Sequence, residues 1–196
     1  MAVQIRERSA TSLLWVEACK LVEPYMGLRD ALDRWGFAAV LAEVLAELVP
    51  EKLPQEELFL ITKDALMHLE ADRDAVNVVI LGLYRALVTL GYILELGSCN
   101  QCKQPSSMVD HYRLHLAGGQ FLCHQHGAGM LGGIRVDLGT VALLRRARTA
   151  GLDQLWRLRL RSGVQTPLLE ALLEVVRTQM SRELKSTKFL RDIGAL

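Results

Sequence analysis

The sequence predicts a mainly α-helical fold, a helical bundle into which a small metal-binding β-hairpin is inserted. Apolar residues recur at helical spacing over long stretches on both sides of residues 99–126. Between these stretches, Cys99, Cys102, Cys123 and His126 form a C-x2-C-x20-C-x2-H pattern. Apolar residues make up 51% and charged residues 23% of the 196 residues. This is the composition of a globular protein that can bury one good core or two small ones.

Residues 1–25 are not expected to fold as an independent element. The sequence of residues 14–21, Leu-Trp-Val-Glu-Ala-Cys-Lys-Leu, could form one strand, but a single strand has no partner to pair with. Either this strand lies against the helices, or it is the leftover edge of a domain that the chain lacks.

Residues 26–94 are expected to form the first part of the bundle. Apolar residues recur at helical spacing from 28 to 48, and Gly36 could divide this run into two helices. A second helix is expected to begin at Pro54, with acidic residues in its first turn, and to end near residue 70. Asp72 is expected to cap a third helix. Its apolar stretch, residues 76–94, is interrupted by Asn77 and Arg85, which indicates a buried helix and not a membrane span.

Residues 95–130 are expected to form a zinc ribbon. Two Cys-x-x-Cys/His elbows flank an alternating segment at 108–116, a turn at 117–119 and a return strand at 120–122. No carboxylate signature of a catalytic zinc site is present, so the pattern favours a closed, structural Zn²⁺ site. His126 is the expected fourth ligand because it repeats the two-residue spacer, with His124 as the alternative. His111 and His115 could also reach the metal, but ordinary surface positions on the hairpin fit them better.

Two other readings of the cysteines are weaker. A thioredoxin-like pair would open a helix after a strand, whereas Cys99 and Cys102 follow a predicted helix end and precede Pro105. A disulfide between them requires an oxidising compartment. No signal peptide is evident, and Cys19 has no obvious partner, so the sequence indicates a reducing cytoplasm.

Residues 131–196 are expected to complete the bundle with basic helices. Residues 127–133 indicate a loop, and Thr140 is expected to cap a short helix that ends near Gly151. Residues 155–161 alternate apolar side chains with arginine and fit either a strand or a helix. Thr166 and Pro167 are expected to open the last long helix.

Charge is distributed unevenly along the chain. Residues 1–75 contain 8 basic and 14 acidic residues, a net charge of −6, whereas residues 140–196 contain 11 and 5, a net charge of +6. Such asymmetry indicates a polyanion-binding end. Trp156, Phe189 and Tyr112 could stack on bases, although each also fits a core position. The basic residues expected to bind DNA or an acidic peptide are Arg145, Arg146, Arg148, Arg157, Arg159, Arg161, Arg177, Arg182, Lys185 and Lys188.

No enzyme is predicted. The sequence contains no Walker-type loop, no dinucleotide-binding glycine motif and no nucleophile elbow. His68 lies in an apolar helical run and fits a partly buried core histidine. Asp72 and Asp74 fit helix-cap and first-turn positions better than catalytic ones.

Taken in order, several segments resemble the C-terminal part of the bacterial recombination mediator RecO, and the likeness extends over about residues 13–193. No single motif is diagnostic, but their order and spacing are fairly specific. The matching segments are residues 28–34 (Leu-Arg-Asp-Ala-Leu-Asp-Arg), 57–59 (Glu-Leu-Phe), 87–92 (Leu-Val-Thr-Leu-Gly-Tyr) leading to 99–102, 118–123 (Gly-Gly-Gln-Phe-Leu-Cys), 183–186 (Glu-Leu-Lys-Ser) and 189–190 (Phe-Leu).

This resemblance implies a helical domain with an inserted zinc finger of the type shared with Arf GTPase-activating proteins. It implies a bacterial, nucleoid-associated cytoplasmic protein that binds single-stranded DNA and the acidic tail of the single-strand-binding protein. It further implies partnership with RecR, loading of RecA and strand annealing. The chain departs from the family pattern in two ways. RecO proteins begin with an OB-fold barrel, of which this chain has at most the last strand, so a truncated or naturally short form is expected. The second elbow also carries histidine where four-cysteine members carry cysteine.

Three functional hypotheses follow. The first is a non-enzymatic DNA repair mediator domain with a structural zinc finger. The second is a zinc-stabilised protein-interaction module that does not contact DNA; in either case Arg145, Arg146 and Arg148 beside the leucine-rich last helix could hold an acidic peptide. The third and weakest is GTPase activation by analogy with the finger, for which Arg113 and Arg135 are the only candidate arginines.

Overall fold

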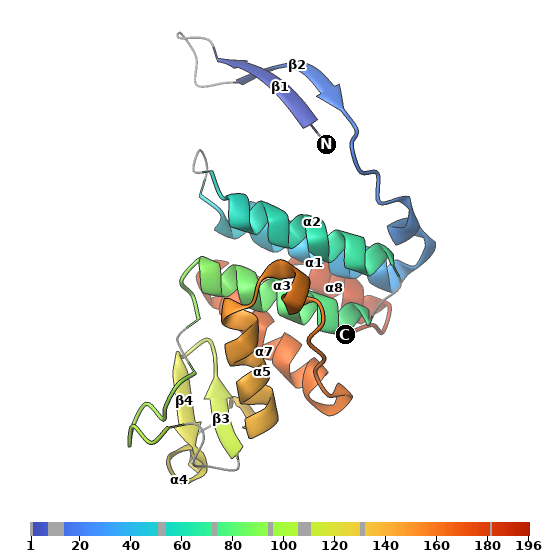
Figure 1. Cartoon of the computed structure of the whole chain (residues 1–196). Helices are drawn as coiled ribbons and strands as arrows, with labels where there is room; N and C mark the ends of the chain where they lie inside the picture. Colours follow the sequence, from blue (N-terminus) through green and yellow to red (C-terminus); the bar gives the residue numbers. More distant parts are fainter. Residues whose placement is uncertain are drawn as a thin grey trace.

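The computed structural model describes residues 2–7, 14–50, 54–71, 74–93, 96–105, 111–129, 132–180 and 182–196. It confirms the mainly helical fold: a helical body lies between a two-stranded sheet at one end and a three-stranded finger sheet at the other (Figure 1). The helices are η1 (Met26–Asp30, a 3₁₀ helix), α1 (Leu32–Leu48), α2 (Glu56–Glu70), α3 (Ala75–Thr89), α4 (His124–Gly127), α5 (Leu138–Thr149), α6 (Leu152–Leu155), α7 (Ser162–Met180) and α8 (Lys185–Asp192). The strands are β1 (Ala2–Glu7), β2 (Leu14–Lys20), β3 (His111–His115), β4 (Gln120–Cys123) and β5 (Ile134–Asp137).

Helix α3 is the centre of the core. It packs against α1, α2, α5 and α7, and every residue from Asn77 to Tyr84 is buried. A helix that is apolar on all sides is stable only when other elements surround it, which is how the structure places it. The expected cap at Asp72 is wrong, because the side chain of Asp74 accepts the hydrogen bond from the Asn77 amide at 3.1 Å; Asp72 itself lies outside the described residues.

Buried Asn77 of α3 also explains the alternating segment that precedes α7. Its side-chain amide donates to the carbonyl of Leu158 at 3.0 Å, and its oxygen accepts from the amide of Leu160 at 2.9 Å. These two bonds satisfy one carbonyl and one amide of the segment without a neighbouring strand. Leu155 ends α6, and residues 156–161 are neither strand nor helix. Helix α7 then begins at Ser162, so the expectation that Thr166 and Pro167 open this helix is wrong: Pro167 lies inside it.

Glu43 of α1 accepts hydrogen bonds from the first residues of α8. The carboxylate of Glu43 accepts hydrogen bonds from the backbone amides of Lys185 and Ser186 at 3.0 and 2.9 Å and from the Ser186 hydroxyl at 2.6 Å. Burial raises the pKa of Glu43, but the bonds from Ser186 and Lys185 outweigh it and hold the pKa below its usual value. An acidic group from a neighbouring helix therefore satisfies the first amides of α8.

Gly36 does not divide α1, which runs unbroken from Leu32 to Leu48. Its missing side chain instead lets α8 approach, because a Cβ at Gly36 would lie 2.5 Å from Leu190 Cδ2 and 3.2 Å from Phe189 Cδ1. Leu190 is buried and cannot swing away into solvent.

Replacing Gly36 with valine is therefore expected to lower the free energy of unfolding by about 1–3 kcal/mol, because the extra atoms overpack the α1–α8 contact. Urea unfolding followed by circular dichroism measures the change. The matched control is Gly163→Val in α7, where an added Cβ meets no atom within 4 Å, and there the change should stay within about 0.5 kcal/mol. Equal effects at the two positions would contradict the close α1–α8 packing.

The N-terminal strand has a partner, contrary to the single strand expected from the sequence. β1 and β2 pair antiparallel, with Ala2 opposite Lys20 and Glu7 opposite Leu14. The resulting ribbon stands apart from α2 in Figure 1. Its apolar side chains Val3, Ile5 and Val16 are exposed.

In the part of the chain that the structure describes, no helix is both long and apolar enough to cross a bilayer.

Candidate metal centre

The four residues of the two elbows converge on one point. The ligand atoms of Cys99, Cys102, Cys123 and His126 all lie within 4.8 Å of one another. The Sγ atoms of Cys102 and Cys123 are 3.9 Å apart, and Nδ1 of His126 lies 3.2 Å from Cys123 Sγ and 3.8 Å from Cys99 Sγ.

These distances fit a tetrahedral zinc ion. Zn–S bonds of about 2.3 Å and Zn–N bonds of about 2.0–2.1 Å at tetrahedral angles place two sulfurs roughly 3.8 Å apart and a sulfur and a nitrogen roughly 3.6 Å apart. Three cysteines and a histidine form a common structural zinc set. The cluster can therefore hold a metal ion, with zinc as the ion that suits its donors.

The first elbow is shaped by a tight turn that returns to Cys99. The amide of Lys103 donates to the carbonyl of Cys99 at 2.9 Å, and the amide of Cys99 donates to the carbonyl of Gln104 at the same distance. Lys103 adopts φ 60°, the left-handed region, to close this turn. Asn100 binds the turn to β4, because its amide donates to the Phe121 carbonyl at 2.8 Å and its side-chain oxygen accepts from the Phe121 amide.

The second elbow lies where β4 becomes α4. Cys123 ends the strand, and His126 lies on the single-turn helix that follows. Gly127 lets that helix rest on the sheet, because a Cβ there would lie 2.7 Å from Cβ of Arg113. His126 joins the cluster and His124 does not; His124 is exposed and its ring lies tilted against His111, with centroids 5.4 Å apart. The preference for His126 as fourth ligand therefore agrees with the geometry.

The backbone around Cys99 favours its thiolate, whereas the neighbouring thiols of Cys99 and Cys123 raise the pKa of Cys102. Burial raises the pKa of the Cys99 thiol, but the amides of Cys123, Cys102 and Gln101 that donate to its sulfur lower this pKa to about 6. The Cys123 amide is one of them, at 3.4 Å. Since thiolate is the form that binds metal, this backbone arrangement prepares Cys99 for a cation.

Sequence reasoning missed the residues that support the elbows. Tyr112 was a candidate for base stacking, but it is fully buried, stacks on Phe121 with ring centroids 4.4 Å apart and donates to the Pro105 carbonyl at 3.1 Å. The third strand, β5, was also missed: it pairs with β3 and extends the finger sheet past residue 130. Alternation at residues 134–137 was the only local signal, and four residues were too few to reveal it.

Asp137, at the end of β5, begins α5. Its Oδ1 accepts from the Thr140 amide at 2.7 Å, so the expectation that Thr140 itself caps the helix is wrong. Its Oδ2 accepts from Arg161 at 2.8 Å. The Thr140 amide is the main cause that lowers the pKa of Asp137, and Arg161 adds to it.

The basic residues expected to bind DNA or an acidic peptide do not form one patch. Arg161 and Arg182 flank opposite ends of α7, whose 19 residues span about 27 Å. Arg148 is half-buried and donates to the Ile93 carbonyl at 3.2 Å. Arg145, Arg146, Arg157, Arg159, Lys185 and Lys188 are exposed. Several arginines near the chain's end are ion-paired: Arg177–Glu174, Arg182–Glu47 and Arg191–Glu183.

The candidate aromatic residues are mostly core residues. Trp156 is 3% exposed and its ring lies against His68, with centroids 5.2 Å apart. This contact confirms His68 as a partly buried core histidine. Phe189 is half-buried where α8 meets Gly36. Base stacking by Trp156 or Tyr112 is therefore incompatible with the structure.

Comparison with known proteins gives a consistent result. The family model described as "Recombination protein O C terminal" matches residues 29–188. The protein named "DNA repair protein RecO" of Syntrophobacter fumaroxidans is 36% identical over 97% of this chain and 76% of its own length. Proteins of the same name from Anaeromyxobacter sp. strain K and Pelotomaculum thermopropionicum are 29% and 28% identical, over 100% and 95% of this chain and 77% and 72% of their own lengths.

Proposed function

The chain belongs to the RecO family of DNA repair proteins, and from this we propose that it is a non-enzymatic mediator of DNA repair and homologous recombination. In this role it binds single-stranded DNA and the single-strand-binding protein, works with RecR to load RecA, and promotes strand annealing. The observation that carries the proposal is the family match over residues 29–188.

Zinc has a structural role in this proposal. Cys99, Cys102, Cys123 and His126 supply four protein ligands, which leave no open coordination position for a substrate. The ion holds the first elbow against β4, and the elbows in turn support the three-stranded sheet. Arg113 and Arg135 lie opposite each other on β3 and β5. The third hypothesis, GTPase activation, still rests on analogy of the finger alone.

DNA binding in this proposal is electrostatic. The net charge of +6 over residues 140–196 attracts the strand, and the basic side chains that contact phosphates release counterions, which gives affinity without sequence preference. The exposed Arg145 and Arg146 on α5 are the cations proposed for the acidic tail of the single-strand-binding protein.

The second candidate function is a protein-interaction module without DNA contact. The ion pairs of Arg177, Arg182 and Arg191 favour it, because arginines neutralised by glutamates add little to a phosphate-binding surface. In that case Arg145 and Arg146 would serve a peptide partner alone.

Binding of the whole chain to a fluorescein-labelled oligo(dT) is expected to weaken steeply with salt. Each contacted phosphate adds about 0.7 to the slope of log affinity against log salt for single strands, so a site with three such contacts loses roughly 20-fold between 50 and 200 mM NaCl. Fluorescence anisotropy measures the affinity. Undetectable binding at low salt, or affinity independent of salt, would contradict the mediator role.

Titration of the wild-type chain with both ligands separates the two candidates, and charge reversal of Arg145 and Arg146 tests whether these arginines form the peptide site. The reversed variant is titrated with oligo(dT) and with an acidic peptide that ends in an apolar residue. Loss of peptide binding with unchanged DNA binding is expected if these arginines serve the acidic tail. If the wild-type chain binds the peptide and no DNA, the interaction module is the correct function.

A further inference from the structure

The outer face of the finger sheet is basic. β3 and β5 pair antiparallel, with His111 opposite Asp137 and Arg113 opposite Arg135. Residues opposite each other share a face of the sheet, and successive residues alternate between faces. These four side chains therefore lie on one face, while Tyr112 between them is buried on the other.

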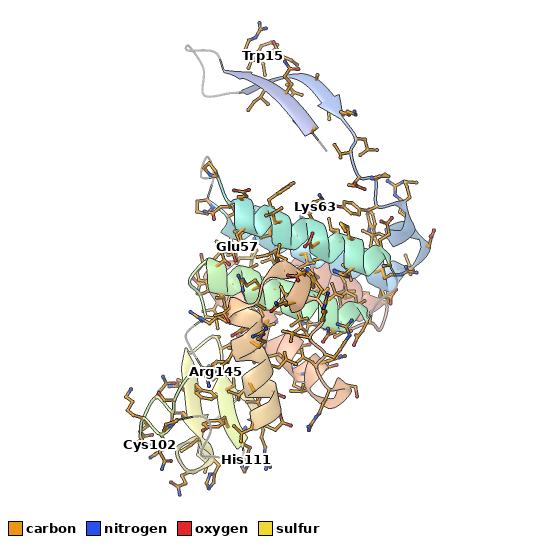
Figure 2. All side chains as sticks on the ribbon, viewed as in Figure 1. Trp15, Glu57, Lys63, Cys102, His111 and Arg145 are labelled. Atoms are coloured by element: carbon orange, nitrogen blue, oxygen red, sulfur yellow. The ribbon has the colours of Figure 1, made fainter. Side chains whose placement is uncertain are left out.

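A cavity of about 460 Å³ opens where this face meets the helical body. His111 and Arg135 line it from the sheet, Asp137 and Thr140 line it at the start of α5, and Arg161 lines it beside the first turn of α7. Figure 2 shows His111 at the end of the finger sheet that lies away from α2. We refer to the cavity lined by these five residues as the finger cleft.

The single carboxylate that lines the finger cleft is already neutralised. One oxygen of Asp137 accepts the Thr140 amide, and the other accepts from Arg161 at 2.8 Å. Arg135 is exposed, and among the described residues no carboxylate forms an ion pair with it. The cleft thus presents an unneutralised guanidinium beside a second one that is anchored in place.

This arrangement differs from that of the C-terminal helices. There Arg177 and Arg182 are held by Glu174 and Glu47, so an incoming phosphate would have to compete with a carboxylate for each guanidinium. A guanidinium fork matches the oxygens of a phosphate group. Among the arginines compared, Arg135 is the one that a phosphate can reach without displacing a carboxylate.

We infer that the finger cleft binds the phosphodiester backbone of single-stranded DNA, with Arg135 as the phosphate contact and with His111 and the Asp137-paired Arg161 beside it. The inference rests on the proposed DNA-binding function and assigns that function to a place: the finger face, and not the basic side of α7 and α8. In this inference the metal centre also contributes to DNA binding, because it supports the sheet that carries Arg135.

The test compares Arg135→Glu with Lys188→Glu, an equally exposed charge reversal on α8. Arg135→Glu is expected to weaken binding to fluorescein-labelled oligo(dT) on the order of tenfold at low salt and to reduce the salt slope by about 0.7 to 1. Lys188→Glu should leave both unchanged, and Arg135→Lys should keep most of the affinity because it retains the charge. Zinc content and near-ultraviolet circular dichroism confirm that each variant is folded.

The outcomes separate failure of the site from failure of the function. Wild-type affinity with Arg135→Glu and lost affinity with Lys188→Glu would overturn the finger cleft while DNA binding stands. Unchanged DNA affinity together with lost affinity for an acidic peptide in Arg135→Glu would make the cleft a peptide site and overturn the inference. If the wild-type chain does not bind oligo(dT) at low salt, the proposed function fails, and the finger cleft fails with it.

Discussion

Removing the metal is expected to unfold the finger and leave the helical body folded. Structural zinc in small sites contributes on the order of 10 kcal/mol of folding free energy, and a three-stranded sheet of four- and five-residue strands has little core to replace it. The helical body is expected to stay folded because α3 packs against α1, α2, α5 and α7, none of which supplies a ligand to the ion. After chelation, hydrogen exchange measured by mass spectrometry should rise sharply at residues 96–105 and 111–129 and change little in α3.

Two cysteine substitutions make the chelation experiment specific. Cys123→Ala should reproduce the effect of the chelator, because its sulfur lies within 4 Å of both Cys102 Sγ and His126 Nδ1. Cys19→Ser is the matched control, since Cys19 is exposed on β2 and outside the cluster; it should keep one zinc per chain by elemental analysis. Unchanged exchange in the finger after chelation, together with no bound metal, would remove the site.

The metal cluster was predictable from sequence because each elbow is a local pattern. A two-residue spacer between Cys99 and Cys102 brings both thiols to one side of a turn whatever the rest of the chain does, and the same holds for Cys123 and His126. The sheet was only partly predictable. β5 pairs with β3 across 20 to 26 positions of the sequence, and such a register depends on tertiary packing that four residues do not encode.

Helix boundaries were less predictable than helices. Asp72 and Asp74 are equally good caps by residue type, and the choice of Asp74 also involves Gln165 of α7, which donates to Asp74 at 2.7 Å. Similarly, Asp137 and not Thr140 caps α5. β5 ends at Asp137 beside the first turn of the helix, where Asp137 also binds Arg161. In both cases a contact distant in sequence selects between local alternatives of similar energy.

The same limitation applies to the arginines. A run of basic residues in sequence predicts net charge, but not which guanidinium groups remain available for a phosphate. Glu47 neutralises Arg182, and Glu174 neutralises Arg177. The pair of Arg182 with Glu47 joins residues 135 positions apart, so no local sequence pattern predicts it. Arg135 lies outside the basic C-terminal third and was considered only for GTPase activation, although the fold leaves it exposed at the finger cleft.

Replacing Arg85 with methionine is expected to lower the free energy of unfolding by about 3–5 kcal/mol. Arg85 lies in the apolar helix α3, and its side chain caps the C-terminal end of α5. Its Nη1 donates to the carbonyls of Ala147 and Arg148 in the last turn of α5 and to that of Ala150, which follows the helix; none of these has a partner within α5. Methionine fills a similar volume but leaves these carbonyls unsatisfied. Urea unfolding monitored by circular dichroism measures the loss.

The ion pair of Arg85 with Glu57 should contribute much less than these carbonyls. The pair has an N–O distance of 2.7 Å, but the Glu57 side chain is 47% exposed. Solvent screens such a pair, so its contribution to the free energy of unfolding is about 1 kcal/mol or below. Glu57→Gln is therefore the control and should cost under about 1 kcal/mol. Arg85→Lys should fall between the two, because one ammonium group keeps the charge but cannot reproduce the geometry of the guanidinium fork. If Glu57→Gln proved as destabilising as Arg85→Met, the ion pair and not the capping of α5 would explain why α3 retains a charge in its apolar surface.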